Sequence, residues 1–199
     1  MKIIAIVDYG AGNLKSVKNA LDYLNVDSRI TDKPEEIRKA DRLILPGDGS
    51  FGYMMENLKE KSLIIPIKNF IKNGKPFLGI CLGLQGLFEE SEESPGIKGL
   101  SIFKGKVVKF RKGKVPQIGW NNIVPNKKGI FKEDFMYFVN SYFVVPEDSS
   151  IVVAMTDYNC NFVSAIQSNN ITAMQFHPEK SGKAGIELLK RWLKCWQKE

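Results

Sequence analysis

The sequence predicts an α/β fold in which a mostly parallel sheet is flanked by helices and antiparallel strands are added in the C-terminal half. In the first half, short apolar runs alternate with segments whose apolar residues recur every three or four positions, which is typical of strand–helix–strand units. After about residue 96, runs rich in Val, Ile, Phe and Tyr follow one another with only turn residues between them, which favours hairpins. The chain contains no repeat, linker or low-complexity segment, so we expect one domain over residues 1–199.

The first half is expected to alternate regularly between strands and helices. Apolar residues at 14, 17, 20, 21 and 24 lie on one face of a helix, and Pro34 is typical of a helix start. A fully apolar run after the turn signal at 74–76 indicates a buried strand. The expected strands are 2–8, 28–31, 42–46 and 77–80, and the expected helices are 13–24, 34–40, 51–60 and 63–73.

The second half is expected to consist of antiparallel strands and a closing helix. Turn residues such as Ser168-Asn169-Asn170 separate the strand-like runs. The closing helix, 182–196, places Ile186, Leu189 and Leu193 on one face. The strand-like runs lie at 100–110, 117–124, 135–145, 151–156, 162–167 and 171–176.

Composition excludes several classes of protein. Hydrophobic residues make up 43% and charged residues 26%, as in ordinary globular proteins, and no apolar run approaches the length of a membrane span. Cys81, Cys160 and Cys195 have neither disulfide-framework nor zinc spacing, which favours a reducing cytoplasm. Because His177 is the only histidine, one chain cannot build a multi-histidine metal site.

The formal net charge of the chain is +7, and lysines are concentrated at residues 104–114. There the lysines alternate with Val107, Val108 and Phe110, a pattern typical of a strand with one solvated face. Attraction of an anionic ligand or partner is the alternative interpretation. No nucleic-acid-binding module accompanies the charge, so we expect no binding to DNA or RNA.

One cysteine stands where a buried strand meets a helix. The strand at 77–80 ends directly before Cys81, and helical spacing of apolar residues begins at Leu82. Gly79 and Gly83 match the small-residue spacing of a nucleophile elbow, with sulfur in place of the usual hydroxyl. A helix N-terminus favours the thiolate, and the Leu82 amide is a candidate anion donor. Cys81 is therefore a candidate nucleophile, although many free cysteines are simply small buried residues.

The only histidine follows a strand and precedes a proline. Pro178 disfavours helical backbone at His177, so the imidazole is expected on extended chain. Residues two apart in extended chain face the same side, which places Glu179 where it can accept the ring N–H. The other ring nitrogen can then take the thiol proton, which makes Cys81, His177 and Glu179 a triad by role. A lone histidine is more often a core or capping residue, but this one is the only base available to the cysteine.

Two sequence blocks resemble class I glutamine amidotransferases: Gly-Ile-Cys-Leu-Gly-Leu-Gln at 79–85 and Gln-Phe-His-Pro-Glu at 175–179. The resemblance to one branch of this family, the glutaminase subunits of imidazole glycerol phosphate synthase, runs nearly end to end. The Gly-Trp-Asn block at 119–121 and the Phe-Val-Asn-Ser-Tyr block at 138–142 specify that branch. The resemblance implies the flavodoxin-like fold of class I glutamine amidotransferases and no cofactor. The remaining similar blocks lie at 8–13, 45–52, 88–93 and 156–158.

The resemblance also implies the hydrolysis of glutamine. Cys81 would attack the side-chain amide, His177 would protonate the leaving ammonia, and water would release glutamate from the thioester. The loop at 47–49 is bounded by glycines and can reorient a peptide plane, which gives a physical route to switching an oxyanion hole on. The hole would be formed at Gly47, Asp48 and Leu82. The substrate would be held by Gly49, Gln85, Ser141 and Tyr142; a polar helix residue lining the cleft is the alternative interpretation of Gln85.

In this branch, ammonia passes to a (βα)8-barrel cyclase subunit, so the resemblance implies a cytoplasmic heterodimer in histidine biosynthesis. Asn13, Trp120, Tyr137 and Lys180 match positions at that interface. Trp120 is expected to be an exposed anchor in a loop, and a core tryptophan is the alternative.

Three residues depart from the usual pattern of the branch. Asn140 and Gln117 stand where histidine is common, and Asp48 stands where valine is usual. A paralogous glutaminase that supplies ammonia to a sugar amidotransferase in surface-polysaccharide synthesis would share the fold and the triad, so this alternative stays open. A cysteine peptidase or a non-catalytic binding module on the same scaffold is a third alternative; Glu179, two residues after the base, and Gln85, placed for a small amide, argue against the peptidase.

Overall fold

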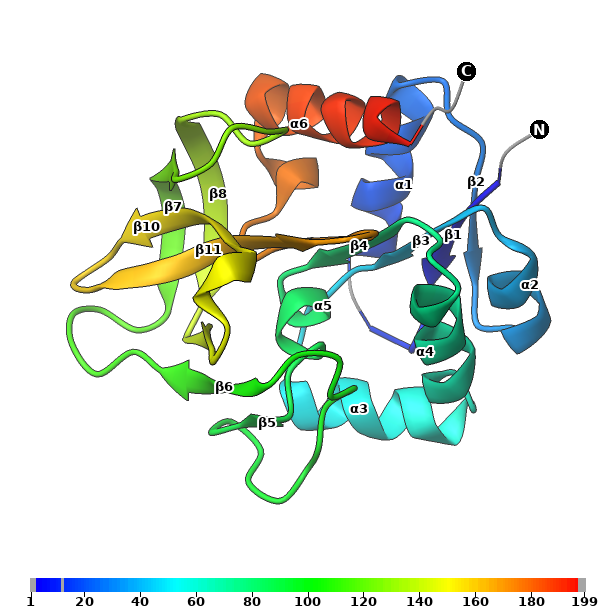
Figure 1. Cartoon of the computed structure of the whole chain (residues 1–199), viewed down its shortest axis with the longest axis horizontal. Coiled ribbons are helices and arrows are strands. Elements are labelled where there is room, and N and C mark those ends of the chain that lie inside the picture. The colour runs from blue at the N-terminus through cyan, green and yellow to red at the C-terminus, as the bar shows by residue number, and fades with distance from the viewer. Residues whose placement is uncertain (1–2, 12, 197–199) are drawn as a thin grey trace.

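The computed structural model describes residues 3–11 and 13–196. Lys2, the first residue of an expected strand, and Gly12 lie outside them. The strands of the sheet, most of which are labelled in Figure 1, lie in the order β2-β1-β3-β4-β12-β11-β10-β7-β8. The first five strands in this order pair in parallel. These parallel strands are β2 (Ser28–Thr31), β1 (Ile4–Val7), β3 (Arg42–Leu45), β4 (Phe77–Ile80) and β12 (Ile171–Met174).

Antiparallel pairing begins at β12 and continues to the far edge of the sheet. These strands are β11 (Asn161–Ser168), β10 (Val152–Asp157), β7 (Gln117–Pro125) and β8 (Asp134–Asn140). A side branch runs from β11 through β9 (Tyr142–Pro146) and β6 (Gly105–Lys109) to β5 (Glu90–Ser91). The predicted α/β fold, with a mostly parallel sheet and antiparallel additions, is confirmed.

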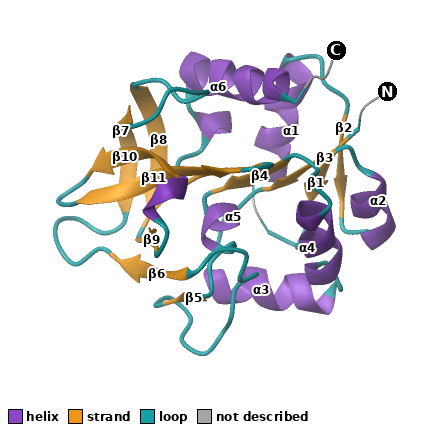
Figure 2. Cartoon of the chain, in the orientation of Figure 1, coloured by secondary structure: helices purple, strands orange, loops and turns teal. Residues whose placement is uncertain are grey.

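Helices cover both faces of the parallel half, as Figure 2 shows. One face carries α1 (Leu14–Tyr23) and α6 (Gly182–Cys195), and the other carries α2 (Pro34–Lys39), α3 (Phe51–Glu60), α4 (Ile64–Lys72) and α5 (Leu82–Gln85). Two short 3-10 helices are η1 (Ser149–Ile151) and η2 (Pro178–Lys180). No helix in the described ranges has the length and apolarity needed to cross a bilayer.

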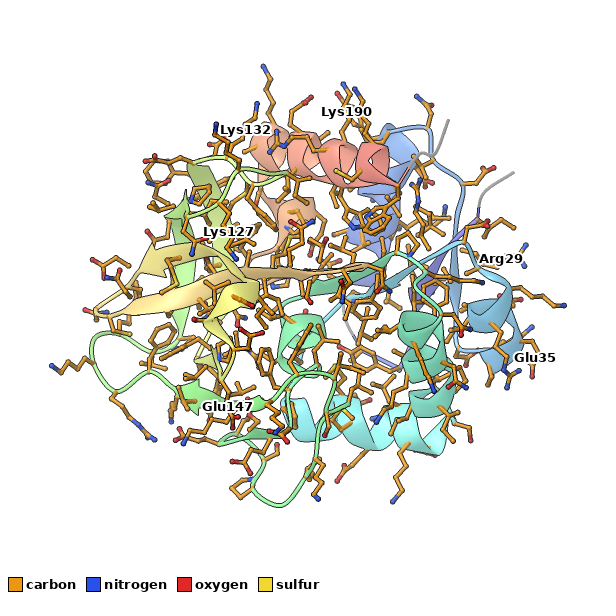
Figure 3. All side chains as sticks on the ribbon, viewed as in Figure 1. Arg29, Glu35, Lys127, Lys132, Glu147 and Lys190 are labelled. Carbon is orange, nitrogen blue, oxygen red and sulfur yellow. The ribbon has the colours of Figure 1, made fainter. Side chains whose placement is uncertain are left out.

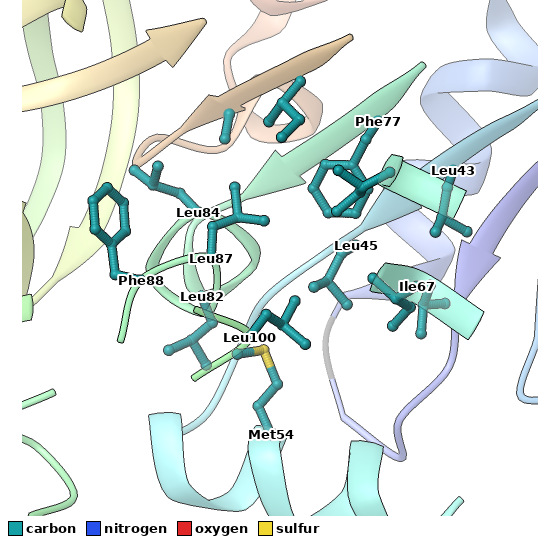
Figure 4. Packing of buried hydrophobic residues seen from close by; sticks show 14 of the residues in the cluster. Leu43, Leu45, Met54, Ile67, Phe77, Leu82, Leu84, Leu87, Phe88 and Leu100 are labelled. Carbon is teal, nitrogen blue, oxygen red and sulfur yellow. The ribbon is translucent and has the colours of Figure 1, made fainter. Parts of the chain in front are cut away.

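Side-chain alternation along the strands produces two cores. On β1, Ile4 and Ile6 join the core beneath α1 and α6, while Ala5 and Val7 join the core on the opposite face. Figure 4 shows part of that second core, where Met54 of α3 lies near Leu82 and Leu100. The start of α5, which follows Cys81, is therefore fixed by buried packing.

The charged side chains labelled in Figure 3 lie at the periphery of the molecule. On β6, Lys106 and Lys109 are exposed while Val107 is fully buried. Lys106 and Lys109 lie three positions apart and point to opposite faces of β6, so the interpretation of the lysine-rich segment as a strand with one solvated face is not confirmed.

Three sequence expectations need correction. The run 135–145 is two strands, because the chain turns at Ser141 and leaves β7, the partner of β8, to pair β9 with β6. The segment 171–174 is antiparallel only on its β11 side, since β12 runs parallel to β4 on the other. The predicted strand at 100–110 begins only at Gly105.

Candidate active site

Cys81 lies at the turn between β4 and α5. Its backbone has φ 53° and ψ −108°, a strained conformation for a residue with a side chain. A Cβ atom on Gly83 would collide with the Leu45 carbonyl oxygen, and one on Gly79 would stand 2.7 Å from the Gly83 carbonyl oxygen. The glycines on either side of the cysteine therefore allow β3, β4 and α5 to approach closely and hold the turn in place.

The sheet brings His177 to the same edge as Cys81. Because β12 runs parallel to β4, with Met174 opposite Ile80, the residues that follow the two strands lie next to each other. His177 has the expected extended backbone, with φ −102° and ψ 95°. Its N–H donates to the Tyr137 carbonyl at 2.9 Å, which fixes this segment against β8.

Glu179 lies against the imidazole, with Oε1 2.7 Å from His177 Nδ1. The side chains of Glu179 and His177 are only 2% and 4% exposed. The expectation that extended chain would place Glu179 here needs correction, because residues 178–180 form the 3-10 turn η2. The turn brings the Glu179 carboxylate against the His177 ring. The predicted contact therefore forms, but through a 3-10 turn and not through extended chain.

The environment of His177 favours its protonated form. Burial alone would lower the pKa of the imidazole, but the charge and hydrogen bond of Cys81 and the Glu179 carboxylate outweigh it and raise that pKa well above its usual range. The arrangement is that of a buried imidazolium beside a cysteine and supported by a carboxylate.

A pocket of about 200 Å³ opens in front of the sulfur. Cys81, Leu82 and His177 line the pocket together with the four residues expected to hold a substrate. Glu93 and Asn140, for which the sequence predicts no role in binding, also line it. Gly47 does not line this pocket and instead packs on Leu82. The lining residues are Asp48, Gly49, Cys81, Leu82, Gln85, Glu93, Pro116, Val139, Asn140, Ser141, Tyr142 and His177.

The expected oxyanion hole is only partly available. The Asp48 N–H donates to the Tyr9 hydroxyl at 3.0 Å, and the Gly49 N–H donates to the Asp48 carboxylate at 3.0 Å. The Leu82 N–H has no acceptor among the described residues. Burial raises the pKa of Tyr9 above its usual range, so its hydroxyl stays protonated and donates to the Asp48 carbonyl. Sequence reasoning missed Tyr9, although it lies in the similar block at 8–13.

Several buried acceptors surround the pocket. Gln85 is 2% exposed, and its Nε2 donates to the Tyr142 carbonyl at 3.2 Å and to Gln175 Oε1 at 3.0 Å. Gln85 Oε1 and Asn140 Oδ1 have no donor among the described residues. With the Glu93 carboxylate, these oxygens can accept hydrogen bonds from a cationic group of a ligand.

The residues expected at a partner interface come from η2 and from elements that contact η2 or the start of α6. Trp120 is 56% exposed and packs edge-to-face on Tyr137, its neighbour across the β7–β8 pair. It lies in strand β7 and not in the expected loop, and its exposure excludes the core alternative. Asn13 caps α1, and Lys180 belongs to η2, directly after Glu179.

Comparisons with known proteins point to one family. The model of the family "Glutamine amidotransferase class-I" matches residues 5–195. Imidazole glycerol phosphate synthase subunit HisH of Pyrococcus furiosus is 50% identical over 96% of this chain and 98% of its own, and that of Aquifex aeolicus is 47% identical over 94% of each.

Solved structures share the fold at lower identity. A crystal structure of glutamine amidotransferase has a TM-score of 0.78 at 18% identity and covers 96% of this chain and 97% of its own. The structure of PurLQS from Thermotoga maritima has a TM-score of 0.76 at 19% identity and covers 98% of both chains. Since the family match spans most of the chain and relatives up to half identical cover nearly all of it, the chain belongs to the class I glutamine amidotransferases.

Proposed function

We propose that this chain is the glutaminase subunit of imidazole glycerol phosphate synthase, acting as one glutamine amidotransferase domain over residues 1–199. The observation that carries the proposal is the buried grouping of Cys81, His177 and Glu179 in front of a pocket. The relatives named HisH support the choice of subunit.

In the first half-reaction, the Cys81 thiolate attacks the side-chain amide carbon of glutamine. The negative charge on the amide oxygen is stabilised by the Leu82 N–H, joined by a loop amide once the loop at 47–49 rearranges. His177 then gives its proton to the departing nitrogen, which leaves as ammonia, and a thioester remains on Cys81.

In the second half-reaction, water attacks the thioester. Neutral His177 takes a proton from the water, the carbon–sulfur bond breaks, and glutamate leaves. Glu179 holds the imidazole in the orientation that both steps require.

The pocket suits the amino-acid end of glutamine. Its α-ammonium group would meet the Glu93 carboxylate and the acceptor oxygens of Gln85 and Asn140. Backbone at Ser141 and Tyr142 and the loop at Gly49 line the remaining space.

The partner in this proposal is the cyclase subunit of the synthase, which receives the ammonia. The exposed Trp120 beside the pocket supports a docking surface there, with Asn13, Tyr137 and Lys180. The sugar-amidating alternative is not favoured, because relatives matching nearly the whole chain are named as synthase subunits. The free cysteines support a cytoplasmic location.

The test is Cys81→Ala in the reconstituted complex. Glutamine-dependent formation of glutamate and of the cyclase product should be lost, while cyclisation with added ammonium salts should continue. Glutamine-dependent turnover that survived this change would overturn the proposal.

A further inference from the structure

We propose that Gln175 is a positioning residue whose side-chain amide donates to Cys81 and stabilises the thiolate. This inference rests on the proposed function. Gln175 is fully buried, and its Nε2 lies 3.4 Å from Cys81 Sγ. A hydrogen bond donated to sulfur is strengthened when the sulfur carries negative charge.

The strand delivers the amide and the imidazole to the sulfur together. Gln175 and His177 follow directly after β12, and the Gln175 amide and the His177 imidazole both interact with Cys81. The Gln175 N–H donates to the Ser164 carbonyl at 2.9 Å and the His177 N–H donates to the Tyr137 carbonyl at 2.9 Å. Both backbones are therefore held by neighbouring strands, which leaves the side chains little freedom to withdraw.

A second glutamine sets which end of the Gln175 amide faces the sulfur. Gln85 Nε2 donates to Gln175 Oε1 and to the Tyr142 carbonyl. If Gln85 were flipped, its own oxygen would face two acceptor oxygens, so its NH₂ group must point towards them. With Gln175 Oε1 occupied in this way, the NH₂ group of Gln175 points to Cys81.

The test measures the pH dependence of Cys81 alkylation by iodoacetamide in the full chain. Gln175→Met keeps the shape but removes the donor, and the midpoint of the pH–rate profile should rise by about one to two pH units. Gln175→Glu keeps an acceptor for Gln85 but puts carboxylate oxygen against the sulfur, so it should raise the midpoint at least as far. Thr172→Val, which removes a buried polar group on β12 just before Gln175, should leave the profile unchanged.

A second measurement leaves Gln175 unchanged. It compares the side-chain amide NMR signals of the unchanged protein with those of folded Cys81→Ala protein. The side-chain proton of Gln175 that faces the sulfur should move upfield when its acceptor is removed, while the Gln85 amide should not. An unmoved alkylation profile in Gln175→Met, or an unmoved Gln175 resonance, would overturn this inference. The proposed function has a separate test, because it would be overturned by glutaminase activity that survives Cys81→Ala.

Discussion

Because His177 is the only histidine, its charge state is directly measurable. In Glu179→Gln the carboxylate that helps to raise the pKa of His177 is removed, so we expect the imidazole titration to move to lower pH by about one unit or more. Histidine-selective NMR reports this one residue without assignment ambiguity. A titration midpoint equal to that of the unchanged protein would contradict the role of Glu179.

The same raised pKa links His177 to stability. The pKa of His177 in the folded state lies above its ordinary value of 6.5. Protonation of the ring therefore stabilises the fold, and this contribution is complete below pH 6.5. This contribution is lost as the pH rises through the folded-state value. In Glu179→Gln, urea denaturation should therefore give a smaller difference in unfolding free energy between neutral and alkaline pH.

Glu93 is expected to recognise the substrate rather than to take part in the chemistry. Glu93→Gln removes the negative charge beside the α-ammonium group, and we expect KM for glutamine to rise about tenfold or more with a smaller effect on kcat. Glu92→Gln is the matched control, because Glu92 pairs with Arg111 outside the pocket. Equal KM values in the two variants would argue against this role.

The site was predictable from sequence only where local pattern fixes position. The glycines around Cys81 and the proline after His177 indicated their backbone conformations. The roles of Tyr9 and Gln175 were not predicted. Each role depends on a contact with a residue from another part of the sheet, and the local sequence pattern does not specify such contacts.

At the scale of elements, the loop after β3 is held by one hydroxyl group. In Tyr9→Phe the Asp48 N–H loses its acceptor and is free to turn towards the pocket. We expect the glutaminase activity of the chain alone to rise by roughly two- to tenfold.

Tyr53→Phe is the control for this change. Its hydroxyl contacts the neighbouring Gly10 carbonyl and not Asp48, so basal activity should stay as it was. If Tyr9→Phe lowered basal activity, the hydroxyl would be needed for the active arrangement instead.

The turn at Cys81 depends on close packing against β3. Gly83→Ala would push a Cβ atom into the Leu45 carbonyl and should lower the unfolding free energy by about 3 kcal/mol or more. Gly129→Ala, where the nearest atom is 3.8 Å away, should change it little. Urea denaturation of both variants provides the comparison.

Elements with clear periodicity were predicted closely, and those that depend on pairing were not. The expected helix 51–60 and strand 77–80 match α3 and β4 because buried faces impose their spacing. The split at Ser141 and the parallel side of β12 depend on which distant strands are available as partners. That choice is made by the whole sheet and not by local sequence.

At the scale of the whole molecule, the exposed face of the β7–β8 hairpin lies beside the mouth of the catalytic pocket. Ile118, Trp120 and Phe135 are all more than half exposed there, while Val139 of the same strand pair lines the pocket. Exposed aromatic and aliphatic side chains next to an active site are typical of a partner surface.

Under the proposed function, Trp120→Ala should therefore weaken binding of the cyclase subunit without disturbing the fold. An aromatic anchor at an interface contributes about 2 kcal/mol or more, so we expect Kd to rise roughly 30-fold or more, measured by calorimetry. Ile65→Ala is the control, because Ile65 is 70% exposed on α4, away from the hairpin. Unchanged alkylation of Cys81 in Trp120→Ala would show that the pocket is intact, and an unchanged Kd would mean that the partner docks elsewhere.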